Sequence, residues 1–231
     1  MKHGECRFML DIETTGIQKE LHDLLQIGIL EIRWNEKFGL WVPGRTFEFT
    51  QHSSRQPESA FAKKHMVELY EKSNNADWIS RSEVRKNIRS FFQSCGVGSQ
   101  PYYREKVIIS GWNVSDFDLP FLCYHGYLEA PGYVVKNGKD EEVGDYNYRI
   151  DEISGAIYFV AEQYGFDRDK LVKYIQDKIE NGQDYFEMPE GKEHDALYDC
   201  YKQAKFKNVL LSFCRELKDG LHENLSEMVS S

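Results

Sequence analysis

The hydrophobic positions in the first 50 residues follow the pattern of β-strands. Three apolar runs occur at 6–12, 24–34 and 45–50. Short joins separate them, the first around Gly16 and the second at Pro43-Gly44. Because short joins between extended runs favour antiparallel pairing, the pattern predicts a three-stranded meander.

The rest of the chain predicts a further strand at 106–110 and a series of helices. In one of them, Val84, Ile88 and Phe91 repeat at the spacing of a single helical face. Strands that are followed by alternating strands and helices indicate one mixed α/β domain over 1–220, with 221–231 as a loose tail. The helices are expected at 57–72, 80–94, from about 117, at 152–164, 167–180 and 194–216.

Two segments lead to more local predictions. The helix from about Phe117 is expected to begin with Ser115 or Asp116 as its N-cap, and its first turn can hold Pro120. The segment 130–146 is polar and rich in glycine, which is typical of a surface loop.

Composition and charge narrow the classes of protein. The 231 residues carry a net charge of −9, so a bulk electrostatic hold on nucleic acid or on an anionic membrane is not expected. The five cysteines form no C-x-x-C pair, which argues against a zinc site or a disulfide framework and favours a reducing compartment. The beginning of the chain shows no signal peptide and no apolar run is long enough to span a membrane, so we expect a cytoplasmic, nucleoid or nuclear location.

Carboxylates occur at positions where apolar neighbours are expected to be buried. Asp11 and Glu13 end an apolar strand, and residues at i and i+2 project from the same face. Two like charges there repel each other unless a cation neutralises them, although a solvated strand end is the ordinary explanation. Asp118 shares a helical face with Phe121 and Leu122, and a buried carboxylate must be paired or bind a metal.

The last predicted helix adds a fourth carboxylate and a histidine. Asp199 lies at the edge of the apolar stripe of this helix, where its side chain can reach the floor of a cleft. His194 starts the predicted helix, on the side away from that stripe. A surface histidine beside an N-cap aspartate, Asp195, is the ordinary explanation for that position.

Taken in order, these residues resemble the DEDDh branch of the DnaQ-like 3′–5′ exonucleases. The first motif, D-x-E-T-T-G, is matched at 11–16, and the third, H-x-A-x-x-D, at 194–199. The second motif runs from Asn113 to Asp118 and Leu122. Its gap is one residue longer than in many relatives, which leaves Asp116 as a second candidate for its carboxylate.

The resemblance implies a ribonuclease H-like fold, a mixed five-stranded sheet flanked by helices, with the fifth strand near 146–151. It also implies two divalent cations, Mg²⁺ or Mn²⁺, which suit oxygen ligands. His194 would act as general base, since imidazole titrates near neutrality. The implied metal ligands are Asp11, Glu13, Asp118 and Asp199.

The resemblance further implies a nucleic acid with a free 3′ end as substrate and nucleoside 5′-monophosphates as products. We expect single-stranded DNA, with an exoribonuclease and a catalytically silent nucleic-acid or polymerase-binding module as the alternatives. A second copy of the chain or a polymerase would be the protein partner. The implied substrate contacts are Glu13, Thr14, Thr15, Phe61, His65 and Asn113.

Overall fold

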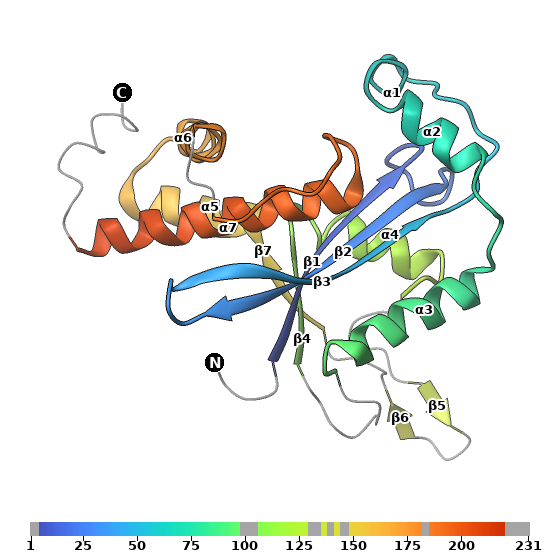
Figure 1. Ribbon diagram of the computed structural model, residues 1–231, viewed down its shortest axis with the longest axis horizontal. Helices are drawn as coiled ribbons and strands as arrows, with labels where there is room; N and C mark the ends of the chain where they lie inside the picture. Colours follow the sequence, from blue (N-terminus) through green and yellow to red (C-terminus); the bar gives the residue numbers. More distant parts are fainter. Residues whose placement is uncertain are drawn as a thin grey trace.

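The computed structural model describes residues 5–97, 106–128, 135–137, 141–143, 148–181 and 185–219. At its centre lies a five-stranded sheet in the order β3-β2-β1-β4-β7 (Figure 1). β1, β2 and β3 form an antiparallel meander, while β4 runs parallel to β1 and β7 parallel to β4. The predicted mixed five-stranded sheet is thus confirmed. Its strands are β1 (Glu5–Thr14), β2 (Leu24–Asn35), β3 (Leu40–Thr50), β4 (Lys106–Gly111) and β7 (Tyr148–Glu152).

Helices cover both faces of this sheet because successive side chains of a strand point to opposite sides. In β1, Phe8 and Leu10 are buried with α3 and α4, whereas Met9 is buried with α5, α6 and α7. Figure 1 shows the two groups of helices on opposite sides of the sheet. The helices are α1 (Ala60–His65), α2 (Val67–Asn74), α3 (Arg81–Ser94), α4 (Asp118–Tyr124), α5 (Ile153–Tyr164), α6 (Arg168–Glu180) and α7 (Ala196–Lys218).

The predicted join at Pro43-Gly44 is wrong, because both residues lie inside β3. The turn comes earlier, where the side chain of Asn35 accepts hydrogen bonds from the N–H groups of Lys37 and Phe38. Gly39 then adopts a left-handed conformation with φ 64°. A proline is tolerated in β3 because this strand is at the edge of the sheet, next to a register shift in β2.

The N-cap predicted for α4 is also wrong. The cap residue is Phe117, and its side chain makes no capping hydrogen bond. The side chain of Ser115 instead donates to Glu152, at the end of β7, and the same carboxylate accepts the N–H groups of Asn113 and Ser115. Glu152, which is distant in sequence, therefore accepts the N–H groups of the turn before α4, and the local sequence pattern could not reveal this contact.

Other boundaries shift by a few residues. The helix predicted at 57–72 begins at Ala60 and is divided in two at Met66. The segment predicted as a surface loop contains two short paired strands, β5 (Val135–Asn137) and β6 (Glu141–Val143). The predicted tail at 221–231 lies outside the described residues. In the described part of the chain, no helix combines the length and apolar character that crossing a membrane requires.

Candidate active site

The end of β1 carries the first two carboxylates of the site. Asp11 and Glu13 alternate with buried Leu10 and Ile12, so they lie on the same face as Met9, which α7 covers. The predicted placement of the pair on one face is therefore what the structure has. Glu13 is 9% exposed, so its carboxylate is largely removed from water.

The start of α7 lies unusually close to the sheet because β2 has a glycine there. Gly28 is the register partner of Asp11, and a Cβ atom on it would lie 2.4 Å from the backbone of Ala196. The N–H of Ala196 donates to Gln26 Oε1 at 2.9 Å, which fixes the first turn of the helix over β2. This close approach brings Asp199, on that turn, to the end of β1.

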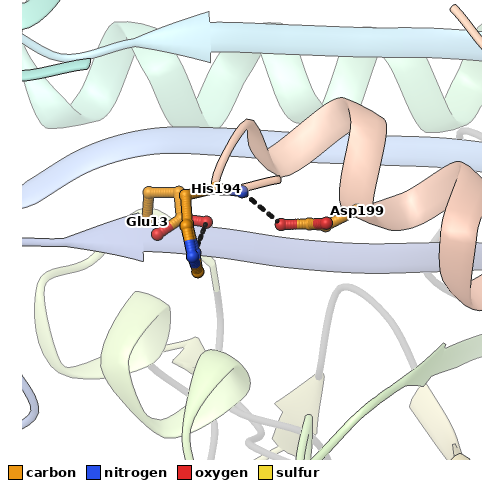
Figure 2. Close-up of side chains that lie close together, drawn as sticks. All are labelled: Glu13, His194 and Asp199. Carbon is orange, nitrogen blue, oxygen red and sulfur yellow. Dashed lines mark hydrogen bonds and ion pairs between the residues drawn. The ribbon is translucent and has the colours of Figure 1, made fainter. Parts of the chain in front are cut away.

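His194 lies directly before α7 in a left-handed conformation, with φ 67°, which is uncommon for a residue with a side chain. Its N–H donates to Asp199 Oδ2 at 2.9 Å, and its ring Nδ1 lies 3.9 Å from Glu13 Oε1. One ligand atom from each of these three residues lies within 4.8 Å of the others. Figure 2 shows Glu13 reaching from β1 toward the two residues of the α7 end.

Asp118 approaches the same end of β1 from α4. It is 4% exposed, and its Oδ1 accepts the N–H of Ile12 at 2.9 Å. Asp116, the alternative for the second motif, is exposed, and its carboxylate accepts the Ser115 hydroxyl. Of the two candidates, the structure brings Asp118 to the other carboxylates.

All four carboxyl groups have a raised pKa, and desolvation by burial is the largest cause in each. Burial raises the pKa of Asp11 well above its ordinary value, and the charges of Asp118, Glu13 and Asp199 raise it further. Burial is also the main cause that raises the pKa of Glu13 to about 8 and that of Asp118 to about 7. It raises the pKa of Asp199 as well. A divalent cation would reverse this trend, and a set of carboxylate oxygens is what Mg²⁺ or Mn²⁺ prefers.

Gln203, which sequence reasoning missed, connects α7 to this cluster. Its Nε2 donates to Asp11 Oδ1 at 2.8 Å, and its Oε1 accepts the N–H of Trp112 at 3.2 Å. Its position four residues after Asp199 was a usable signal, because i and i+4 share a helical face. Gly28 also gave a signal, since a glycine inside an apolar strand indicates close approach of another backbone.

The predicted substrate contacts divide into those near His194 and those held elsewhere. The rings of Phe61 and His65, on α1, lie 4.9 and 5.9 Å from the ring of His194. The Thr14 hydroxyl donates to the Gly16 carbonyl oxygen, and the N–H of Thr15 donates to the carbonyl oxygen of Asp23.

Asn113, the last of the predicted substrate contacts, is exposed and is hydrogen-bonded to residues of two other segments. Its N–H donates to Glu152 at 2.6 Å, and its Oδ1 accepts the Ser154 hydroxyl at 3.1 Å. These contacts connect Asn113 to the end of β7 and the start of α5.

The strand order and the flanking helices define the class of fold, which is the ribonuclease H-like fold of the DEDDh 3′–5′ exonucleases. The nuclease domain of 3′hExo, a DEDDh family member bound to rAMP, matches with a TM-score of 0.57 and 18% identity over 95% of this chain and 94% of that one. ExoI of E. coli in complex with single-stranded DNA matches with a TM-score of 0.56 and 13% identity over 95% of this chain.

A full-length 3′-exonuclease has a TM-score of 0.52 and 17% identity over 93% of this chain. The chain spans 61% of that exonuclease and 43% of ExoI. No protein-family model and no curated protein matches the sequence. At 13–18% identity, the matched structures establish the fold alone.

Proposed function

We propose that this protein is a metal-dependent 3′–5′ exonuclease that releases nucleoside 5′-monophosphates from the 3′ ends of nucleic acids. The observation that carries the proposal is the convergence of Asp11, Glu13, Asp118 and Asp199 at one end of β1, with His194 beside them. The matched structures support it, because they are 3′-exonucleases with the same fold.

The donor set fits two divalent cations. Asp11, Glu13, Asp118 and Asp199 would hold Mg²⁺ or Mn²⁺, and such ions, when bound, stabilise the charge that develops on the attacking and leaving oxygens. The crowding of desolvated carboxyl groups supports this assignment, since the charges of Asp199, Asp118 and Asp195 all raise the pKa of Glu13, and a bound cation would offset them.

His194 is assigned as the general base that takes a proton from the attacking water. Its backbone is held by the hydrogen bond from its N–H to Asp199, so the ring is positioned at the edge of the carboxylate cluster. The ring is half-buried, which leaves it open to a substrate on one side. A base in that position can reach water at the cluster without being one of its four carboxylate ligands.

Single-stranded DNA is the substrate that we propose. The position of Phe61 favours a single strand over a duplex, whether the strand is DNA or RNA. Its ring is 53% exposed and stacks obliquely on His65, with the two centroids 4.9 Å apart. An exposed ring beside the site can stack on an unpaired base, which a duplex does not offer. Because no feature of the site distinguishes a 2′-hydroxyl, an exoribonuclease is the second candidate.

Degradation of 5′-labelled DNA and RNA oligomers of one sequence, run side by side with Mn²⁺, tests this proposal. We expect both wild-type ladders to shorten from the 3′ end, with the DNA ladder faster, and we expect no shortening with the Asp118→Asn variant. Faster RNA shortening would make the protein an exoribonuclease. If the protein bound either oligomer but shortened neither, it would instead be a catalytically silent nucleic-acid-binding module.

A further inference from the structure

A pocket that the carboxylate cluster does not line lies beside the start of α3 and the end of α4, two helices that Figure 1 shows on the same side of the sheet. Its volume is about 640 Å³, within the range of small-molecule sites. The connection between α2 and α3, the segment after β3 and the end of α4 form its walls. None of the four carboxylates and neither His194 nor Phe61 lines it.

The lining of this pocket includes a largely exposed aromatic ring. Trp78 is 71% exposed, although it is the largest side chain that lines the pocket. An exposed indole is a platform on which any of the nucleobases can stack.

The start of α3 also lines the pocket. Ser80 caps α3 through a hydrogen bond from the N–H of Glu83, and Arg81 and Ser82 follow at the first turn of this 14-residue helix. The N–H groups at such a helix start favour a phosphate. The guanidinium of Arg81, which hydrogen-bonds the side chain of Tyr127, adds a positive charge to the lining. The only acidic residue in the lining is Asp23, and its charge is offset by Arg55, whose Nε lies 2.9 Å from Asp23 Oδ2.

Two residues that line the pocket also have a buried polar atom without a hydrogen-bond partner in the described part of the chain. Gln51 lines the pocket and is 7% exposed, yet its Oε1 has no hydrogen-bond partner in the described part of the chain. The Nε2 of His125, another lining residue, is buried without a partner there as well. Buried polar atoms without partners are rare and costly, so a bound base toward which either side chain turned would gain a hydrogen bond.

From these features we infer that the pocket binds a nucleotide, with its base on Trp78 and its phosphate at the start of α3. A nucleotide in this pocket could be part of the substrate strand or a free molecule. Leu24, in the lining, pairs with Thr14 across β1 and β2, so the pocket adjoins the strand ends that carry the candidate active site. It could therefore hold an upstream nucleotide of the substrate strand, a reading that rests on the proposed exonuclease function, or a free nucleotide.

Isothermal titration calorimetry with deoxyadenosine 5′-monophosphate, in excess EDTA, tests the pocket without relying on activity. We expect Trp78→Ala to weaken binding about 5- to 150-fold, as for loss of one stacked base, and Arg81→Gln to weaken it as well. The matched controls are Phe159→Ala, another exposed aromatic residue, and Arg85→Gln, one turn further along α3. Wild-type affinity in Trp78→Ala, or no binding by the wild type, would overturn the inference.

Single-turnover rates on DNA oligomers of 2 to 10 nucleotides then identify the source. If the pocket holds an upstream nucleotide, Trp78→Ala slows long oligomers and leaves dinucleotides unchanged. If it holds a free nucleotide, the variant loses calorimetric binding but cleaves every length at the wild-type rate. Absence of cleavage by the wild type would contradict the proposed function. The calorimetric result would still show whether the pocket binds a nucleotide.

Discussion

Asp116 and Asp118 are two residues apart but have different surroundings. Asp118 is buried and bonded to the backbone of β1, whereas Asp116 is exposed and does not cap α4. We predict that Asp118→Asn abolishes oligonucleotide degradation, while Asp116→Asn keeps it and changes the free energy of unfolding by less than about 0.5 kcal/mol. Rates and melting curves of the two variants check this. Loss of activity in Asp116→Asn alone would move the second motif to that residue.

His194 is assigned to proton transfer, so its replacement should slow the chemical step and spare metal binding. We predict that His194→Ala lowers the single-turnover rate by about 10²- to 10⁴-fold, with Mn²⁺ affinity close to that of the wild type. Rapid-quench kinetics and calorimetry measure the two quantities. Because a His194 ligand atom lies within 4.8 Å of those of Glu13 and Asp199, loss of Mn²⁺ binding would identify His194 as a ligand instead.

The sequence could indicate individual candidate residues where the chemical pattern is local. Asp11 and Glu13 stand out because they interrupt an apolar strand, and Asp118 because it shares a face with buried residues. The spacing of Gln203 from Asp199 indicates a shared helical face, but it does not indicate the partners of Gln203, Asp11 and the backbone of Trp112, which are distant in sequence. A hydrogen bond between distant segments has no signature in residue spacing.

The contact between α7 and β2 depends on the absence of a side chain at Gly28. We predict that Gly28→Ala displaces the start of α7, since the added Cβ would lie 2.4 Å from backbone atoms that cannot rotate away. Both the melting temperature and the exonuclease rate should fall. Gly155→Ala is the matched control: the nearest atoms are at 3.6 Å, and alanine is favoured over glycine in a helix by about 0.5–1 kcal/mol. Equal melting temperatures for the two variants would contradict the packing argument.

Strands and helices were predictable where periodicity and length agree, as in β1, β2 and α3. The turn between β2 and β3 was misplaced because Pro43-Gly44 has the composition of a turn, although an edge strand also accepts it. The start of α4 was misplaced because Glu152, on another strand, satisfies the N–H groups that a local cap would satisfy. In both cases tertiary contacts outweighed local preference.

The crowded carboxyl groups give the stability of the metal-free protein a defined dependence on pH. The pKa of Glu13 is raised to about 8 and that of Asp118 to about 7, so the folded state holds protons that the unfolded chain releases near pH 4. This contribution is complete at low pH and is lost as the pH rises through 7 to 8.

We therefore predict that in EDTA the melting temperature falls by several degrees between pH 6 and pH 8.5, and that Glu13→Gln flattens this decline. Mn²⁺ should stabilise the wild type more at pH 8 than at pH 6, since the ion competes with protons for the same oxygens. Differential scanning calorimetry at the two pH values measures both effects. A metal-free protein that becomes more stable over this range would contradict the desolvated cluster.

The measurement that tests the proposed function most directly is hydrolysis of a 5′-labelled single-stranded DNA oligomer by the wild-type protein, with Mn²⁺ and with excess EDTA. We predict stepwise shortening from the 3′ end with release of deoxynucleoside 5′-monophosphates when Mn²⁺ is present, and no shortening in EDTA. Undiminished hydrolysis in excess chelator would contradict the assignment of Asp11, Glu13, Asp118 and Asp199 as a divalent metal site.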